Sequence, residues 1–434
     1  MTVKIPYFNS RLENDILFMF LLTPFWWVSG LSVFIFQAVS LALFLKFLMI
    51  LLYSNQSIKI PKPASWFFLF LVFYILSILV NAGIRPPQRI FASINNYTFL
   101  VMGMILMLMI YQCDAEFFFE NYCNVCRILC AVSGVLGLFF LANWLWGNRE
   151  ADTTAWLGSR MPALMESPFF YNLMHLKGTV DEESLGTVVP RLALYTSAPT
   201  STGGFMLLII PMMMAYYALH PKKKIEYGFV LFLSLTALVF SMTRAAIYGL
   251  VLGWVLVRIL EGGKKQMAAS LLLFALTFNY LSQATQWLWE MRKSSNAGRI
   301  EVVEDAIRIV SEQNIWMGVG IHMREGFVFR AIGTHALYVE ILFVSGLLGL
   351  AAFILFQASL FYCWYAQKTR LEDPLEKILW RFLGMTLISV NVWIFTDSLT
   401  AVPYTPYGYF LMAGGIFLLD RALRTGGLKE LSMN

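Results

Sequence analysis

Three side chains that could take part in chemistry lie where polar segments of the chain meet long apolar runs. Arg191 comes just before one run, and Arg244 sits in the tight turn Ser241–Ala245 between two others. His335 closes a polar stretch and opens a further run. A guanidinium suits bidentate contact with phosphate, and an imidazole suits general base work near neutral pH. The set is a candidate for phosphate recognition beside a base, although each arginine alone is also typical of an interfacial anchor.

Other polar residues are weaker candidates for the same place. His322 follows a glycine turn and could line the cavity that His335 faces. Glu340 lies one to two helical turns beyond His335, and Asp397 ends a later apolar run. No pair of histidines has the spacing of a zinc site such as HExxH, so we expect no metal ion.

The cysteines do not change this expectation. Cys123, Cys126 and Cys130 begin an apolar run at spacings that place them on one helix face. A zinc site would need a second ligand pair, which the sequence lacks. Small packing residues are therefore the favoured interpretation.

Composition assigns these residues to a membrane protein. Of the 434 residues, 59% are hydrophobic and 13% are charged, whereas soluble domains carry about a quarter charged residues. The net charge of +6 follows from basic residues sorted to one side of a membrane, and no nucleic-acid partner is expected. No nucleotide-binding loop is present. We predict an all-α, polytopic fold in which residues 1–434 form a single transmembrane domain.

The apolar runs predict about twelve transmembrane helices, because about 30 Å of hydrocarbon requires about 20 apolar residues. The runs lie at about 15–30, 32–53, 66–80, 94–112, 124–146, 202–219, 227–242, 246–259, 267–283, 335–362, 379–396 and 405–420.

Two long polar segments interrupt these runs. Residues 147–190 have room for one or two short surface helices, and loops of this length are usually functional or disordered. Residues 284–334 include a stretch with apolar residues at helical spacing, which predicts an amphipathic helix. Its apolar positions are Ile300, Val303, Ile307 and Val310. A glycine-broken turn at Trp316–Gly320 follows.

Lysines and arginines in the short loops set the orientation. They gather on the side of the two chain ends, for example at Lys222–Lys224 and at Lys264 and Lys265. The positive-inside rule makes that side cytoplasmic, so we expect both termini inside the cell. The segments 147–190 and 284–334 then lie outside, together with the two arginines and His335.

These features together resemble the bacterial O-antigen ligase and O-antigen polymerase family. The resemblance is carried by Arg191 with the downstream Pro199, by the turn Thr243–Ala245, and by the stretch from Arg299 to Gly349. In that stretch an arginine opens the loop helix, a GxG turn follows, and a histidine precedes an apolar helix containing GLLG.

The resemblance implies a glycosyltransferase of the bacterial inner membrane with its active site facing the periplasm. Members move a glycan from an undecaprenyl diphosphate carrier to a sugar hydroxyl with inversion, without a metal ion or other cofactor. By this resemblance Arg191 and Arg244 hold the diphosphate and His335 is the base. Arg299 and His322 are weaker candidates for substrate binding, His322 because of its position after the glycine turn. The acceptor is a second carrier-linked glycan for a polymerase or a lipid A-core sugar for a ligase.

The sequence leaves these alternatives open. The segment 147–190 offers room beside the site for a growing chain, which favours polymerase slightly over ligase. A transporter or flippase for a lipid-linked sugar would instead carry ionisable residues at mid-membrane depth and internal repeats, and neither is evident here.

Overall fold

The structure, a computed structural model, is helical over most of the residues that it describes. These residues are 6–54, 58–84, 87–147, 152–166, 174–184, 187–195, 198–262, 268, 272, 293–321, 336–399, 404–426 and 428. The long helices are α1 (Pro6–Leu21), α3 (Ser32–Ser54), α4 (Ala64–Asn81), α5 (Pro87–Gln112), α6 (Ala115–Leu145), α10 (Pro199–Leu219), α11 (Lys224–Phe240), α12 (Arg244–Glu261), α14 (Lys293–Gln313), α15 (Leu337–Gln367), α16 (Pro374–Ile394) and α17 (Tyr404–Thr425). Short helices are α2 (Thr23–Ser29), α7 (Trp156–Arg160), α8 (Pro162–Met165), η1 (Ala82–Ile84), η2 (Pro221–Lys223) and η3 (Lys368–Arg370).

Seven helices in the described part of the chain are long and apolar enough to cross a membrane, namely α3, α4, α5, α6, α10, α15 and α16. The other predicted runs on described residues are helical too, but shorter, more charged or, in α17, less apolar. α1 has 16 residues and α11 has 17, and α12 includes Arg244, Arg258 and Glu261. The predicted run at 267–283 falls almost entirely outside the described residues. A multi-pass helical membrane protein is thus supported, while the number of about twelve spans stays a prediction.

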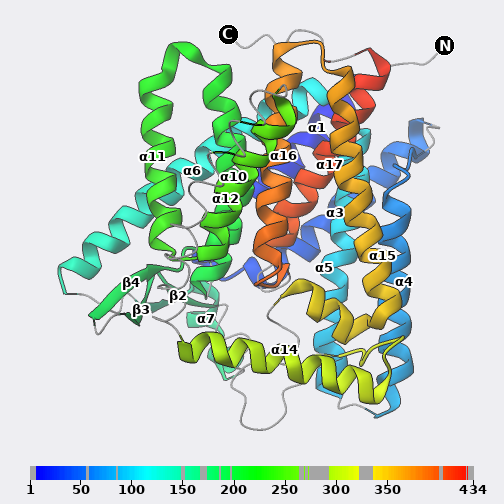
Figure 1. Cartoon of the computed structure of the whole chain (residues 1–434), viewed down its shortest axis with the longest axis vertical. Helices are drawn as coiled ribbons and strands as arrows, with labels where there is room; N and C mark the ends of the chain where they lie inside the picture. Colours follow the sequence, from blue (N-terminus) through cyan, green and yellow to red (C-terminus); the bar gives the residue numbers. More distant parts are fainter. Residues whose placement is uncertain are drawn as a thin grey trace.

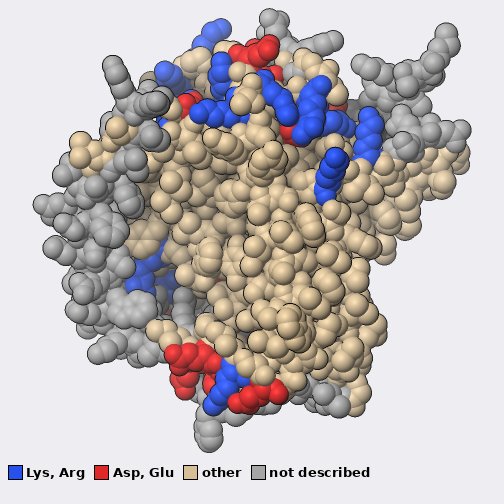
Figure 2. Space-filling view, turned by 45° about the vertical axis from the view of Figure 1, so that its right-hand side comes forward, with Lys and Arg blue, Asp and Glu red and all other residues tan. Residues whose placement is uncertain are grey.

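The bundle has two unlike ends. Figure 1 marks both chain ends at one end, which we call the terminal end, and shows α14 lying across the other end, near the strands. On the face shown in Figure 2, basic side chains gather at the terminal end with some acidic ones among them, and a smaller group at the opposite end is mainly acidic. The predicted orientation, in which the terminal end faces the cytoplasm, stays a prediction.

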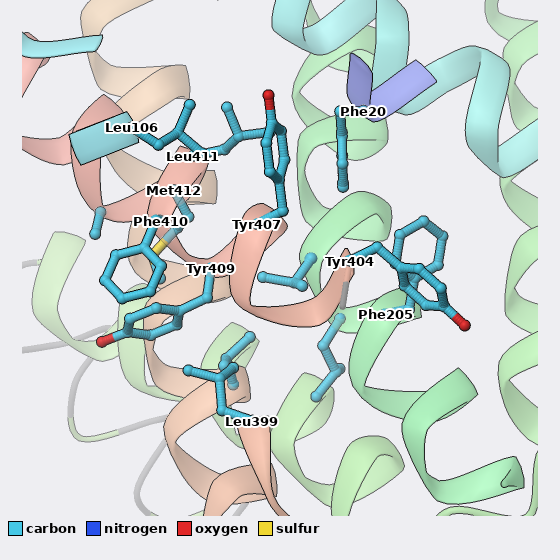
Figure 3. Close-up of a cluster of buried hydrophobic side chains, with 14 of the residues drawn as sticks. Phe20, Leu106, Phe205, Leu399, Tyr404, Tyr407, Tyr409, Phe410, Leu411 and Met412 are labelled. Carbon is cyan, nitrogen blue, oxygen red and sulfur yellow. The ribbon is translucent and has the colours of Figure 1, made fainter. Parts of the chain in front are cut away.

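Helix α17 runs through the middle of the core. From Tyr404 to Leu419 its residues are all buried, and aromatic rings extend from it in several directions (Figure 3). The Tyr404 ring meets Phe205 of α10 at 5.5 Å between centroids, and the Tyr409 hydroxyl accepts a 2.7 Å hydrogen bond from Gln357 of α15. A helix that is apolar all round is expected in such an interior position.

Small residues allow α12 to pack closely on α16. A Cβ at Gly249 would lie 2.6 Å from the backbone oxygen of Ser389, and one at Gly253 would lie 2.8 Å from that of Met385. This GxxxG spacing is a common way for membrane helices to bring their backbones together.

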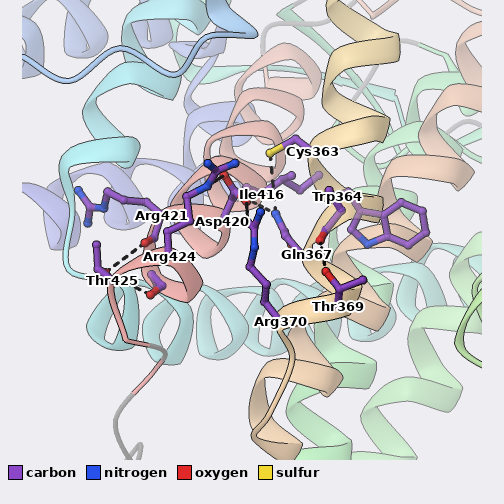
Figure 4. A network of polar contacts seen from close by, with 12 residues as sticks. Cys363, Trp364, Gln367, Thr369, Arg370, Ile416, Asp420, Arg421, Arg424 and Thr425 are labelled. Atoms are coloured by element: carbon purple, nitrogen blue, oxygen red, sulfur yellow. Dashed lines mark hydrogen bonds and ion pairs between the residues drawn. The ribbon is translucent and has the colours of Figure 1, made fainter.

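An ionic network joins α15, η3 and α17 at the terminal end (Figure 4). Asp420 accepts from Arg370 Nη1 at 2.9 Å and from Arg424 Nε at 2.7 Å. Gln367 donates to the backbone oxygen of Ile416 at 2.8 Å. Basic residues here therefore have acidic partners within the protein.

The first polar segment contains strands that the sequence analysis did not predict. Strand β1 (Asp152–Thr154) pairs antiparallel with β2 (His175–Lys177), and β3 (Thr179–Ser184) pairs antiparallel with β4 (Thr187–Leu192). The short helices α7 and α8 lie between β1 and β2 in the chain. An all-α fold is thus wrong for this segment, because Thr and Val enrichment around 179–192 favours a hairpin.

The predicted amphipathic helix is present as α14, but its buried face differs from the predicted one. Val302, Ala306 and Val310 are buried, whereas Ile300 and Ile307 are each 46% exposed. The spacing of apolar residues allowed two overlapping faces, and packing against α15 selects the one centred on Ala306.

Helix α15 is broken one-third of the way along. Gly346 has φ 66° and ψ −169°, which no helix contains. The segment Ile315–Gly320, which contains the predicted glycine turn Trp316–Gly320, inserts at this break. Val319 N and Gly320 N donate to Phe343 O and Val344 O at 2.8 and 3.0 Å. The inserted segment therefore satisfies carbonyl groups that the break leaves without helical partners.

The segment Ile315–Gly320 also accepts hydrogen bonds from the part of α15 that follows the break, and helix α4 holds the segment and the break in place. Leu347 N and Leu348 N donate to the backbone oxygens of Ile315 and Trp316 at 2.9 and 3.3 Å. From α4, Ser77 Oγ donates to Val344 O at 2.6 Å, and Asn81 Nδ2 donates to Gly318 O at 3.3 Å. These contacts fix the direction of the first piece of α15.

Candidate active site

Arg191 lies on β4 with its side chain turned into the protein. It is 7% exposed and pairs across the hairpin with Val180. The hairpin is tied to α6 by a 2.7 Å hydrogen bond from Trp144 Nε1 to Asp181. Arg191 Nε donates to the backbone oxygen of Ser241 at 3.2 Å. A guanidinium whose strand and first contact are both fixed loses little entropy when it binds an anion.

The turn that carries Arg244 is held by hydrogen bonds to α10 and α11. Thr243 Oγ1 donates to the backbone oxygen of Pro199 at 2.9 Å, and Ser241 Oγ donates to that of Leu238 at 2.7 Å. Thr243 also packs where Gly203 leaves room, since a Cβ there would lie 2.5 Å from it. Arg244 is the first residue of α12 and is half-buried.

The two predicted arginines thus belong to one region of the structure. Arg191 contacts the backbone of the turn three residues before Arg244, although 52 residues separate them in the sequence. Guanidinium groups suit bidentate contact with phosphate, so this region is the candidate place for binding a diphosphate.

The two predicted acids meet at the start of α15. Glu340 and Asp397 are 5% and 7% exposed. Glu340 accepts a short hydrogen bond from Ser398 Oγ. Leu337 N donates to the backbone oxygen of Asp397 at 3.1 Å, so the chain after α16 holds the first turn of α15. Ser398 is a site residue that the sequence analysis missed, because a lone serine carries no signal of its partner.

Helix α10 connects the arginine turn with this acidic cluster. Its first residue, Pro199, accepts from Thr243, and the next, Thr200, accepts from Trp393 Nε1 of α16 at 3.1 Å. Trp393 lies four residues before Asp397. The described parts of the site therefore share one hydrogen-bonded frame.

An apolar pocket adjoins the acidic cluster. Its lining comes from α4, α5, α15, α17 and the chain between α16 and α17, and includes Phe67, Phe70, Tyr74, Leu100, Leu337, Glu340, Ile341, Val344, Ser345, Phe353, Leu399 and Phe410. Glu340 is the acidic member of this lining, so one carboxyl group faces apolar surroundings there.

Backbone strain marks the same three places. Among the described residues, those with positive φ that are not glycine are Tyr195 (61°), Met242 (50°) and Ala336 (87°). Each lies within four residues of Arg191, Arg244 or His335. Such conformations cost about 1–3 kcal/mol each and cluster at functional sites. This observation is independent of the side-chain chemistry from which the three residues were predicted.

Several predicted site residues cannot be placed. His322 and His335 lie outside the described residues, and so does the side chain of Arg299, although its backbone belongs to α14. Over the described chain, no cluster of three His, Cys, Asp or Glu side chains could hold a metal ion. Metal independence stays a prediction.

Comparison with known families bears on this arrangement. Residues 229–354 match one family model. Its description is O-antigen ligase. The resemblance inferred from the motifs is thereby confirmed, and glycosyl transfer at a membrane is the activity that the O-antigen ligase family implies. The match includes Arg244 and the stretch 299–349, whereas Arg191 precedes it. Among curated proteins, none matches the chain.

Proposed function

We propose that this protein transfers a glycan from an undecaprenyl diphosphate carrier to a sugar hydroxyl during assembly of a surface polysaccharide. The observation that carries the proposal is the contact of Arg191 with the turn that bears Arg244. It joins a residue before the O-antigen ligase match to one inside it. The proposed place of reaction is the periplasmic face of the bacterial inner membrane.

The two arginines would bind the diphosphate in the ground state and neutralise it as it leaves. Charge develops on the bridging oxygen when the glycosidic bond breaks, and fixed donors at that point stabilise the transition state. The buried position of Arg191 strengthens this effect, because fewer water molecules compete with it.

His335 would accept the proton of the attacking hydroxyl, which adds to the anomeric carbon opposite the departing diphosphate. Ala336, with its positive φ, separates His335 from the first turn of α15. Glu340 lies in that first turn and is held by Ser398, so the segment next to the base is anchored from α16.

The acceptor separates two versions of this function. We favour a polymerase, in which the acceptor is a second carrier-linked glycan, because the hairpin β3–β4 and the strands β1–β2 form a structured surface beside Arg191. In the alternative, a ligase, lipid A-core is the acceptor. A flippase is a third possibility and would move the carrier without forming a glycosidic bond.

A reconstituted assay tests these versions. Purified protein in liposomes would be incubated with carrier-linked glycan, with and without lipid A-core, and with EDTA in a parallel arm. We expect a ladder of glycan products in the reaction that lacks lipid A-core, and the same ladder when EDTA is present. Modification of core alone would show a ligase, and loss of product in EDTA that added divalent ion restores would contradict metal independence.

Variants test the roles. His335→Ala should lower turnover about 10²–10⁴-fold, while Arg191→Ala and Arg244→Ala should also weaken donor binding. Lysine at either arginine position should restore only part of the donor binding and turnover. It keeps the positive charge but cannot form the bidentate hydrogen bonds of a guanidinium. Arg160→Ala is the matched control, an exposed arginine on α7. Near-normal ladders from His335→Ala would show that the base is another residue, with His322 the next to test.

A further inference from the structure

A second group of basic and aromatic side chains lies at the far end of α10 from the candidate active site. It is formed by Arg127 of α6, Tyr216 of α10, His220 and Lys223 beyond it, and Tyr227 of α11. Helix α10 begins beside the Arg244 turn and has 21 residues, which span about 30 Å. The group therefore cannot share a ligand headgroup with that site.

The geometry of this group brings cations onto aromatic faces. The Arg127 guanidinium lies 5.4 Å from the Tyr216 ring centroid and 5.6 Å from that of Tyr227. Lys223 Nζ lies 5.8 Å from the Tyr227 ring. The His220 ring stacks on Tyr216 at 4.0 Å, with Nδ1 2.8 Å from the Tyr216 backbone oxygen. Such cation–π contacts keep the charged groups at one place.

The Arg127 guanidinium uses only some of its N–H groups in this arrangement. Its Nε and Nη2 both donate to Asn124 Oδ1, at 3.0 and 2.8 Å. A guanidinium carries five N–H groups, and within the described chain the other three make no hydrogen bond that would satisfy them. Arg127 is half-buried, so these donors are positioned and not freely solvated.

The group also lacks acidic partners, in contrast to other basic residues at the terminal end. Arg370 and Arg424 share Asp420, and Arg381 pairs with Glu261. Among the ion pairs of described residues, none includes Arg127 or any lysine of Lys222–Lys224. The nearest acid in the sequence, Glu226, is exposed and makes no such pair either. Within the described part of the chain, Arg127 and Lys222–Lys224 thus have no carboxylate within 4 Å.

An apolar track continues from Arg127 along α6. Val135 and Leu138 lie eight and eleven residues beyond Arg127, which places them on the same helix face. They are 59% and 45% exposed. A ligand that combines an anionic head with an apolar tail would match both parts of this surface.

We propose that Arg127, Lys223 and the two tyrosines bind the headgroup phosphate of an anionic phospholipid, with one acyl chain along Val135 and Leu138. The phosphate oxygens would accept from the remaining Arg127 N–H groups and from the lysine ammonium. The tyrosine rings hold both cations in place before the lipid arrives. Free phosphate would meet the cations but leave the apolar track uncovered.

Binding of defined lipids to the purified full chain tests this proposal. The protein in dodecyl maltoside would be titrated with dioleoylphosphatidylglycerol, with dioleoylphosphatidylcholine or with inorganic phosphate, and lipid retention would be measured by native mass spectrometry. We expect retention of phosphatidylglycerol above the other two. The variant R127Q/K223Q should bind it about 25-fold more weakly, roughly fivefold for each charge removed.

Two controls separate a defined site from general attraction to basic residues. Lys62→Gln removes an exposed basic residue of the α3–α4 connection, outside the group, and should leave binding unchanged. Arg127→Lys should keep part of the affinity. Equal retention of phosphatidylcholine, saturation by phosphate alone, or an equal loss in Lys62→Gln would each overturn the proposal. Catalytic turnover serves as the check that R127Q/K223Q is folded.

Discussion

Replacing Gly318 with alanine would test how tightly the segment Ile315–Gly320 fits the break in α15. The added Cβ would lie 2.5 Å from Gly346 N, 2.8 Å from Phe343 O and 2.8 Å from Ser345 N. All three are backbone atoms, so no flexible side chain can move aside. Alanine at the φ of +74° costs about 1–2 kcal/mol, and overpacking adds roughly 1–3 kcal/mol. We expect a total destabilisation of about 2–5 kcal/mol.

Gly147→Ala is the matched control for this substitution. Gly147 has a φ of +93°, and apart from its chain neighbours no atom of the described residues lies within 4 Å of its added Cβ. It isolates the conformational cost, about 1–2 kcal/mol. Both variants would be melted in the same detergent, with loss of the monomer peak in size-exclusion chromatography as the readout. A Gly318→Ala protein that melts together with Gly147→Ala would refute the close fit between the segment and the break.

Two further predictions concern charge and topology. Glu13 is fully buried before the first predicted span, and burial raises its pKa from 4.5 to about 8, against the smaller lowering effects of hydrogen bonds from Asp114 and Cys113 and of the Arg421 charge. The stability that its neutral form provides is complete below pH 4.5 and lost as the pH rises through 8, so the melting temperature should fall between pH 5 and 8 in the wild type and stay level in Glu13→Gln. For topology, a cysteine at Ser159 should react with an impermeant maleimide on intact spheroplasts and one at Gly262 should not; the reverse pattern would contradict the orientation.

The sequence alone was sufficient to predict where the long helices lie and that Arg191 lies near the turn that bears Arg244. Long apolar runs have few alternatives to a membrane helix, so the runs on described residues became helices. The arginine prediction rested on position at the ends of runs, and the structure places Arg191 against the turn of Arg244. The roles of these residues and of His335 remain predictions.

Other features depend on contacts between distant segments and could not be read locally. Ser345–Gly346 lies in an apolar run that predicts an unbroken helix, and the break appears only because Trp316–Gly320 and α4 supply its hydrogen bonds. The buried face of α14 was likewise chosen by its neighbours. Ser398 donates a hydrogen bond to Glu340, 58 positions earlier in the sequence. A pairing over such a distance cannot be predicted from residue spacing.

The break in α15 also constrains the order in which the chain can assemble. In hydrocarbon, the carbonyl groups of Phe343 and Val344 need partners, and Ser77, one of these partners, precedes Val344 by 267 residues. Helix α4 is synthesised before α15. The first piece of α15 therefore acquires its final direction only when α15 packs against α4. The region next to His335 is therefore among the last parts of the protein to acquire its final shape, which delays a competent site until the bundle around it is complete.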